Sequence, residues 1–360
     1  MKHKILFFIP HLSGGGAERV AVNIMNQLDS KKYEVYLVIL NRKHCEIIDI
    51  VSPSVKLIEL GVDKTIISVL KLRNVISTIN PHFLFSTLIR SHIAVDLALK
   101  FLKNKPKVIY RSPNSPKLLI ENKQLSGLTK YLLDHSYRRA DIVLAQTPEM
   151  KKELESYHKV SINKITVMLN PINREYINRS IESENNPFDC RLINVVAAGR
   201  LIYQKGFDIL IESFSEVIKN NKKFRLFIVG EDVCNEKEKY LNIARNLGIS
   251  DYVCFLGFQN NPYKYFYFSD LYVLSSRWEG LPNTVLENLY LKKPIIATKC
   301  IPFMNELISD GNNGILVDVN NVSELSRAIL NYKEINTDYK SIDFNTSSLV
   351  NILTRFTQQM

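Results

Sequence analysis

Cysteine is scarce in this sequence, and none of the cysteines stands in a metal-binding or redox spacing. The five of them, Cys45, Cys190, Cys234, Cys254 and Cys300, form no C-x-x-C pair and have no histidine-rich neighbourhood. This scatter argues against a disulfide framework and against a structural zinc site. We therefore expect a protein of a reducing compartment.

Long hydrophobic runs are also missing. No stretch reaches the ~18 uninterrupted apolar residues that a membrane-spanning helix needs, so any membrane contact is expected to be peripheral. The N-terminal "MKHKILFFIP" begins with basic residues, but its apolar run ends at Pro10 and is shorter than a signal-peptide core. We expect this segment to form the first β-strand.

Positive charge is concentrated in the first half of the chain. Residues 1–180 contain 28 Lys and Arg against 15 Asp and Glu, whereas the remainder contains 19 against 21. Such asymmetry indicates an anionic partner for the first half, either nucleic acid or a phospholipid surface. A basic face that only keeps the protein soluble explains the same asymmetry.

Short apolar runs alternate with amphipathic stretches along the 360 residues, which exceed the ~250–300 residues that one core usually supports. In the first half the runs are "KILFFI", "EVYLVIL", "FLFST", "KVIYRS", "DIVLAQT" and "KITVML", with helical stretches at 16–28, 90–102, 125–138 and 148–156. After the polar segment 174–191, a second series has helical stretches at 206–219, 235–246, 262–268, 283–291 and 322–333. This alternation predicts two α/β domains, each with a parallel sheet covered on both faces.

The polar segment and the C-terminal tail complete the expected domain plan. "REYINRSIESENNPFDCR", residues 174 to 191, is Asn-rich and is predicted to be the inter-domain linker. The tail has apolar residues at 349, 350, 352, 353 and 356, which predicts a helix that docks on one of the domains. Because open parallel sheets bind ligands at the carboxyl ends of their strands, we expect the site in a cleft between the domains.

A glycine-rich loop follows the first predicted strand. In "PHLSGGGAERV", residues 10 to 20, the glycines would let backbone N–H groups approach a phosphate at the start of a helix. Counting from Gly14, the third glycine position of the dinucleotide fingerprint holds Arg19, and no Gly-Lys-Ser/Thr ending is present. The loop is either a phosphate-binding turn or only a tight strand-to-helix connection.

A second strand-to-helix connection, "GRLIYQKGFD" at residues 199 to 208, carries two cations. Arg200 at the end of the strand and Lys205 just before the helix can converge on one point. A guanidinium fork and a flexible ammonium together suit a pyrophosphate. The alternative is a pair of solvated cations on a surface loop.

Two glutamates flank a Gly-Leu-Pro turn in "RWEGLPNTVLE", residues 277 to 287. On one ideal helix Glu279 and Glu287 would lie about 80° apart, and Pro282 would kink such a helix. We therefore expect a helix to begin at Pro282 or Asn283, with Glu279 in the preceding loop. Ionised carboxylates accept hydrogen bonds and sugar hydroxyls donate them, so the pair suits two hydroxyl-rich rings. Acids that stabilise a helix start are the alternative.

Taken together, "SGGGAERV", "GRLIYQKGFD", "YFYFSDLYVLSSRWEGLPNTVLENLYLKKPIIAT" and "NELISDGNNGILVDVNN" resemble the retaining glycosyltransferases of family 4. The resemblance covers nearly the whole chain, and is greatest to bacterial transferases that build lipopolysaccharide, O-antigen or capsule. It implies the α/β GT-B fold, with two Rossmann-like domains facing a central cleft. Residues 1–180 would form the acceptor-binding domain, 181–340 the nucleotide-sugar-binding domain, and 341–360 a C-terminal helix that crosses back to the first.

The resemblance also implies roles for individual residues. Arg200 and Lys205 would hold the donor diphosphate, Glu279 the transferred sugar and Glu287 the ribose, with the first three acting as the catalytic residues. The rest of the implied donor-binding set consists of Gly15 and Gly16, from the other domain, and Gly280, Leu281, Pro282, Asn283 and Thr284, whose backbone would cap the phosphates.

Two departures from common family features affect the acceptor side and the metal. Relatives often carry a histidine on the loop after the fourth strand, where this chain has "YRSPNSP". Arg111 and Asn114 take that place, so they and His11 are assigned to the acceptor or substrate, and no catalytic histidine is named. The sequence has no D-x-D motif to hold a divalent ion on a sugar-nucleotide diphosphate. We expect no metal site and no cofactor beyond the nucleotide-sugar co-substrate.

The function implied by the resemblance is retaining transfer of a hexose or N-acetylhexosamine from a nucleoside-diphosphate sugar to a lipid-linked saccharide. UDP is favoured over GDP, and the expected location is the cytoplasm, at the inner face of the cytoplasmic membrane. The cations expected to meet an anionic bilayer are Lys100, Lys103, Lys105, Lys107, Lys117, Lys123, Lys130, Arg138 and Arg139. A GT-B epimerase or phosphorylase remains an alternative. A nucleic-acid-binding protein would leave the glutamate pair and the two cations without a role.

Overall fold

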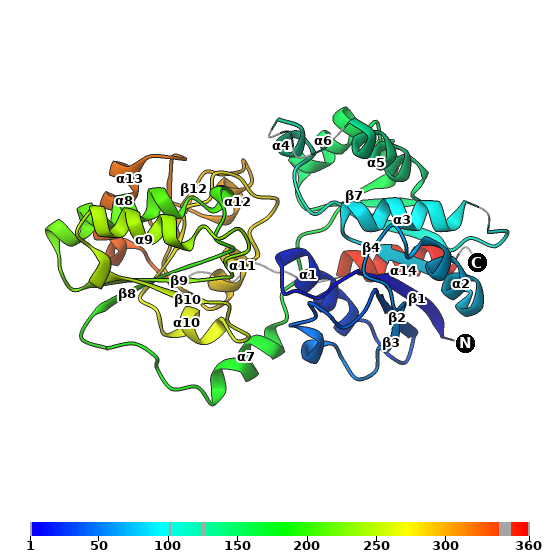
Figure 1. The fold of residues 1–360 in the computed structure, drawn as a ribbon, viewed down its shortest axis with the longest axis horizontal. Helices are drawn as coiled ribbons and strands as arrows, with labels where there is room; N and C mark the ends of the chain where they lie inside the picture. Colours follow the sequence, from blue (N-terminus) through cyan, green and yellow to red (C-terminus); the bar gives the residue numbers. More distant parts are fainter. Residues whose placement is uncertain are drawn as a thin grey trace. The chain divides into compact units, whose positions relative to one another are not determined.

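The computed structural model describes residues 2–100, 102–121, 123, 125, 127–337 and 347–358. The chain divides into two compact units (Figure 1). Unit 1 comprises Met1–Ile172 with Phe344–Met360, and unit 2 comprises Asn173–Asp343.

Unit 1 is built on a seven-stranded parallel sheet with the order β3-β2-β1-β4-β5-β6-β7. Its strands are β1 (His3–Phe8), β2 (Tyr33–Ile39), β3 (Lys56–Glu59), β4 (Phe83–Ser86), β5 (Lys107–Arg111), β6 (Ile142–Ala145) and β7 (Ile165–Val167). In the central strands nearly every side chain is apolar and buried, because helices cover both faces of the sheet.

The helices of unit 1 form two layers. They are α1 (Gly16–Asn26), α2 (Val69–Ile79), α3 (Ile89–Leu99), α4 (Pro116–Glu121), α5 (Gly127–Arg139), α6 (Pro148–His158) and α14 (Ser347–Gln358), with 3-10 turns at Ile48–Ile50 and Ile162–Lys164. Helices α1 and α14 share one apolar core with the sheet, and α2, α3, α5 and α6 share the core on its other face.

Unit 2 has a six-stranded parallel sheet with the order β10-β9-β8-β11-β12-β13. Its strands are β8 (Ile193–Ala198), β9 (Phe224–Val229), β10 (Val253–Gly257), β11 (Leu271–Leu274), β12 (Ile295–Thr298) and β13 (Gly314–Val317). Its helices are α7 (Arg174–Glu182), α8 (Phe207–Asn220), α9 (Lys237–Asn246), α10 (Tyr263–Phe268), α11 (Asn283–Tyr290), α12 (Met304–Leu307) and α13 (Val322–Leu330), with 3-10 turns at Tyr203–Lys205, Ser250–Tyr252 and Tyr332–Glu334. Helices α8, α9 and α13 pack together over one face (Figure 1).

The predicted architecture of two parallel sheets with helices on both faces is confirmed. Strand β3 and helices α2, α4 and α12 are additional elements that the sequence pattern did not indicate. The predicted helices in both series agree with the observed ones to within about three residues at most ends, the usual uncertainty of helix boundaries.

The prediction that residues 174–191 form a linker is wrong for its first half. Residues Arg174–Glu182 form α7, whose N-terminus is capped where the Asn173 side chain accepts a hydrogen bond from Tyr176 N at 3.0 Å. Ile177 is 1% exposed, and the Tyr176 ring packs edge-on against Tyr263 of α10. The units therefore divide after residue 172 rather than 180. The sequence did not indicate this boundary, because a nine-residue helix with one buried side chain resembles a polar linker.

The apolar stripe in the tail predicted a helix, and α14 is that helix. Leu349, Ile352 and Leu353 are buried in the core that α1 and the sheet of unit 1 form. The side chain of Phe356, and residues 341–346 of the predicted C-terminal segment, lie outside the described residues.

Candidate functional site

Two loops of unit 2 lie together at the carboxyl ends of neighbouring strands. Strand β8 pairs with β11, so the loop of residues 199–206 after β8 lies beside the loop of residues 275–282 after β11. The first loop leads into α8 and the second into α11. The motifs "GRLIYQKGFD" and "RWEGLPNTVLE" are therefore brought to one edge of one sheet, where open α/β sheets bind ligands.

The backbones of these two loops approach closely. Arg277 N donates to Gln204 O at 2.7 Å, and Ser275 Oγ donates to Lys205 O at 2.9 Å. Gly206 has a φ of +64°, and a Cβ built on it would lie 2.2 Å from Ser275 O. Only glycine combines this left-handed conformation with so close an approach.

Lys205 and Glu279 form an ion pair across the two loops. Lys205 Nζ donates to Glu279 Oε1 at 2.6 Å, and the side chains are 18% and 10% exposed. Ser276 Oγ donates to the same oxygen at 2.7 Å, and Gln204 Nε2 lies 3.5 Å from Oε2. Because several donors converge on it in a partly dry site, the carboxylate is held in one orientation.

Arg200 differs from Lys205 in its surroundings. It follows β8 directly and is exposed. Within the part of the chain that the structure describes, its guanidinium forms no side-chain hydrogen bond or ion pair. The edge of the sheet therefore carries one cation already matched to a carboxylate and one that faces solvent with its donors available.

The prediction for the second glutamate's local structure is confirmed. Helix α11 begins at Asn283 after Pro282, which leaves Glu279 in the loop and Glu287 within the helix. Glu287 is 7% exposed and accepts a hydrogen bond from Tyr263 Oη of α10 at 3.2 Å.

The segment between the two glutamates forms the N-terminal end of α11. Gly280, Leu281 and Pro282 are buried, while Asn283 and Thr284 are half-buried. Thr284 Oγ1 accepts a hydrogen bond at 2.6 Å from Tyr272 Oη, and burial raises the pKa of that phenol. The N-terminus of α11 places the positive end of the helix dipole at this edge.

In unit 1 the glycine-rich loop opens α1 as predicted. Gly15 is the N-cap residue and Gly16 is the first helical residue. A Cβ on Gly15 would lie 2.5 Å from Glu18 Oε2, the end of a flexible side chain in the first turn of α1. The predicted closure of this loop on a ligand held by unit 2 stays a prediction.

The residues assigned to the acceptor are differently exposed. Arg111 is 2% exposed, its Nη1 donates to Thr87 Oγ1 at 3.0 Å and its Nη2 donates to Asn170 Oδ1 at 2.5 Å. Burial lowers the pKa of this guanidinium to about 10. Arg111 thus ties strand ends of unit 1 together, whereas Asn114 is exposed and His11 is half-buried with its ring against His44. A substrate role for these three residues stays a prediction.

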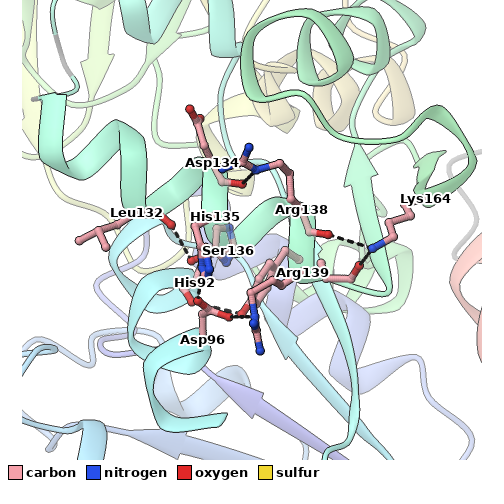
Figure 2. A network of polar contacts seen from close by, with 11 residues as sticks. His92, Asp96, Leu132, Asp134, His135, Ser136, Arg138, Arg139 and Lys164 are labelled. Carbon is pink, nitrogen blue, oxygen red and sulfur yellow. Dashed lines mark hydrogen bonds and ion pairs between the residues drawn. The ribbon is translucent and has the colours of Figure 1, made fainter. Parts of the chain in front are cut away.

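Figure 2 shows a polar network that joins α3 to α5. Asp96 Oδ2 lies 2.8 Å from His135 Nδ1, and Asp96 Oδ1 lies 3.0 Å from Arg139 Nε. His92 on α3 is fully buried, with Nδ1 3.0 Å from Ser86 Oγ, and burial lowers its pKa to about 3. A neutral, enclosed imidazole of this kind is a core residue.

Several residues of the site in unit 2 were not indicated by the sequence. They are Gln204, Ser276 and Tyr263, which contact the two glutamates, and the ion pair between Arg277 and Asp208. Three of these five residues lie inside the two motifs or at their ends and Ser276 directly precedes the second motif, so position in or beside a motif was the available signal. Among the described residues, no group of three or more His, Cys, Asp and Glu side chains is placed to hold a metal ion.

Comparison with protein families matches almost the whole chain to two adjoining models. Residues 14–176 match the model described as Glycosyltransferase Family 4, and residues 178–346 match the model described as Glycosyl transferases group 1.

Individual relatives agree with these matches. An uncharacterised glycosyltransferase of Methanocaldococcus jannaschii is 34% identical over 58% of this chain, which spans 53% of that relative's length. The N-acetylgalactosamine-N,N'-diacetylbacillosaminyl-diphospho-undecaprenol 4-alpha-N-acetylgalactosaminyltransferase of Campylobacter jejuni is 27% identical over 91% of this chain and 89% of its own. The Anabaena protein HepE, solved with UDP and glucose, superposes with a TM-score of 0.82 over 99% of this chain and 100% of its own, at 16% identity.

Proposed function

Because the chain belongs to the glycosyltransferases, joining a Family 4 domain to a group 1 domain on the GT-B fold, we propose that it transfers a hexose or N-acetylhexosamine from a nucleoside-diphosphate sugar to a lipid-linked saccharide. Family membership establishes the class of enzyme. The donor, the acceptor and the stereochemistry are the proposed part.

The observation that carries the donor assignment is the pairing of cations with an oriented carboxylate at one sheet edge. Arg200 is exposed, Lys205 is held by Glu279, and the N-terminus of α11 adds the positive end of its helix dipole. A diphosphate is attracted by the cations and the dipole, and a sugar needs the carboxylate, because its hydroxyls donate. The same edge therefore offers partners to both halves of a nucleotide sugar.

The chemistry follows from where charge develops. As the bond between the anomeric carbon and the diphosphate oxygen breaks, the sugar becomes oxocarbenium-like and negative charge grows on the leaving group. Arg200 and Lys205 stabilise that growing charge, so they lower the barrier rather than only binding the donor. A new bond forms from the anomeric carbon to the acceptor hydroxyl oxygen on the same face, and the acceptor proton passes to the departing phosphate. Configuration is retained, and neither an enzyme nucleophile nor a metal is required.

Two relatives support the identity of the substrates. HepE was solved with UDP and glucose, and the name of the Campylobacter enzyme describes transfer of N-acetylgalactosamine to a saccharide on diphospho-undecaprenol. We therefore favour a UDP-sugar donor, a polyprenyl-diphosphate-linked acceptor and a role in bacterial surface-glycan synthesis for this chain.

A donor screen tests the proposal. Purified protein is incubated with UDP- and GDP-linked hexoses and N-acetylhexosamines, with and without EDTA, and release of the nucleotide is measured. We expect hydrolysis or transfer with one UDP-sugar, retained in EDTA, and faster release when a polyprenyl-diphosphate saccharide is added. Epimerised donor without acceptor, or a strict need for inorganic phosphate, would assign the chain to the epimerase or phosphorylase alternative. A salt-dependent shift with RNA and no response to any nucleotide sugar would overturn the proposal.

The structure limits which of the predicted cations can contact a membrane together. Within the described residues, no helix is both long and apolar enough to cross a bilayer. The cations assigned to a membrane face lie at two opposite ends of the sheet, because helices run antiparallel to the strands of unit 1. Lys103, Lys105 and Arg139 are near the amino ends of the strands, while Lys117 and Lys130 are near the carboxyl ends. One flat surface therefore does not hold all of them.

Exposed apolar side chains favour the carboxyl ends of the unit 1 strands as the membrane-binding side. Leu128 and Tyr131, in the first turns of α5, are 70% and 63% exposed. Ile66, Ile67 and Leu70, at the start of α2, are 60 to 70% exposed. Burying one such side chain contributes about 1.5–3 kcal/mol, whereas each cation near an anionic surface contributes about 1 kcal/mol. We propose that this carboxyl-end apolar face, together with the exposed Lys117, meets the bilayer, whereas the ammonium of Lys130 is held by Asp134 at 2.7 Å.

Vesicle sedimentation checks this assignment. The full chain should sediment more with anionic than with neutral vesicles, and Leu70→Glu with Leu128→Glu should weaken binding about tenfold or more through lost apolar burial. Leu247→Glu, at a 40% exposed leucine of unit 2, is the matched control and should bind like the parent protein. Equal binding to both kinds of vesicle, or equal weakening by the control, would contradict the assignment.

A further inference from the structure

Arg277 connects the two loops of the donor site but faces away from solvent. Its side chain is 8% exposed and forms a two-pronged ion pair with Asp208, in which Nη1 donates to Oδ1 at 2.9 Å and Nη2 donates to Oδ2 at 2.8 Å. Asp208 lies in the first turn of α8, three residues after Lys205. The pair therefore joins the loop after β11 to the helix that follows the loop after β8.

Arg277 also holds the middle of the loop after β8. Its Nη1 donates to Tyr203 O at 2.7 Å, and its guanidinium carbon lies 3.9 Å from the centre of the Tyr203 ring. Tyr203 begins the 3-10 turn that ends at Lys205. One side chain thus fixes both ends of the short segment that carries Lys205.

These contacts leave Arg277 little capacity to bind a ligand directly. Both of its terminal nitrogens donate to Asp208, and one of them also donates to the Tyr203 carbonyl. Burial opposes ionisation of Asp208, yet the hydrogen bonds from Arg277 hold the pKa of this carboxyl below its usual value. The guanidinium charge is therefore matched within the protein, unlike that of the exposed Arg200.

We propose that Arg277 is a positioning residue which, through Asp208 and Tyr203, holds the loop after β8 against the loop after β11 so that Lys205 stays on Glu279. The inference rests on the proposed function, because it assigns the pair of loops to the donor. A misplacement of about 1 Å in a reacting group lowers the rate by about 100-fold, so a loosened segment costs activity even though Arg277 touches no substrate.

The variants are chosen to break the ion pair without removing bulk. Arg277→Gln, Asp208→Asn and the double variant are compared with Arg191→Gln. The control removes another two-pronged Arg–Asp pair of unit 2, in which Arg191 donates to Asp189 at 2.7 Å, just before β8 and at the opposite end of the sheet. Thermal unfolding of each variant gives its folded fraction, to which the activities are normalised.

The single tryptophan of the chain provides a readout that needs no substrate. Trp278 follows Arg277, its carbonyl accepts a hydrogen bond from Gln204 Nε2 at 2.9 Å, and its ring lies 6.0 Å from that of Tyr203. In the ligand-free protein, Arg277→Gln and Asp208→Asn should shift the emission of Trp278 and increase its quenching by acrylamide. Arg191→Gln should leave both unchanged.

The kinetic arm uses the donor found in the screen. Each single variant should lower kcat per folded molecule by about 100-fold. The kcat of the double variant should be no lower than that of the less active single variant, because the two residues act as one unit. Additive losses, unchanged Trp278 emission, or a loss explained entirely by the folded fraction would overturn the inference. If the parent protein turns over no nucleotide sugar, the proposed function fails, and Trp278 in the free protein still decides whether Arg277 orders the loops.

Discussion

Lys205→Ala is expected to lower kcat by about 10²–10³-fold, the range found when one preorganised donor to a developing negative charge is removed. Lys205 lies at the carboxyl end of β8 with its ammonium fixed by Glu279 at 2.6 Å, so it is already oriented before a donor arrives. Its removal takes away a positive charge that would stabilise the negative charge growing on the leaving diphosphate. We expect weaker binding of UDP as well, since part of this attraction exists in the ground state.

The fold should survive this substitution. Glu279 keeps the hydrogen bond from Ser276, and the backbone contacts between the two loops do not involve the Lys205 side chain. Lys239→Ala is the control, because it removes a different Lys–Glu contact, with Glu236, from the surface of unit 2. Kinetics at saturating donor and thermal unfolding of both variants are the measurements. Turnover like that of the parent protein in Lys205→Ala would refute the role.

The local structure of the site could be predicted because it depends on short-range rules. Pro282 restricts the backbone enough to place the start of α11 at Asn283, and the glycines of residues 14–16 mark the start of α1. The alternation of apolar runs with helical stretches was sufficient for two parallel sheets. In each case the determining residues lie within a few positions of the structure that they specify.

The partners of the site residues could not be predicted, because they depend on approaches between distant segments. Lys205 and Glu279 are 74 residues apart, and their contact exists because β8 and β11 are neighbours in a strand order that the sequence does not display. The sequence analysis assigned them separately, to the diphosphate and to the sugar. In the structure they form one ion pair, so a donor that binds both residues is expected to change their contact.

Burial of polar groups was the second kind of feature that the pattern concealed. Arg111 was assigned to the substrate because it takes the place of a histidine that relatives often carry there, yet Thr87 and Asn170 satisfy its terminal nitrogens inside unit 1. Similarly, the α7 segment was taken for a linker because residues 174–191 are polar and Asn-rich, yet Ile177 of this helix is buried. In both cases segments distant in the chain supplied the hydrogen-bond partners or the apolar neighbour.

Glu279→Gln is expected to separate sugar recognition from diphosphate binding. The carboxylate accepts hydrogen bonds from Lys205 and Ser276 on one oxygen, which leaves capacity on the other for a sugar hydroxyl. Replacing a charge-assisted hydrogen bond, which contributes about 1.5–3 kcal/mol, by a neutral one should lower kcat by up to about 100-fold. The ammonium of Lys205 then loses its counter-charge and becomes more available to the diphosphate, so UDP alone should bind at least as tightly as before.

The two variants are expected to differ in UDP binding although both lower turnover, and this difference tests the assigned roles. Lys205→Ala should weaken both UDP binding and turnover, whereas Glu279→Gln should reduce turnover and spare UDP binding. Calorimetric titration with UDP, beside kcat for the UDP-sugar, measures both quantities for each protein, and Glu236→Gln on the surface of unit 2 is the control carboxylate. Loss of UDP binding in Glu279→Gln would mean that the carboxylate orders the diphosphate site instead of holding the sugar. Unchanged turnover would remove Glu279 from the reaction.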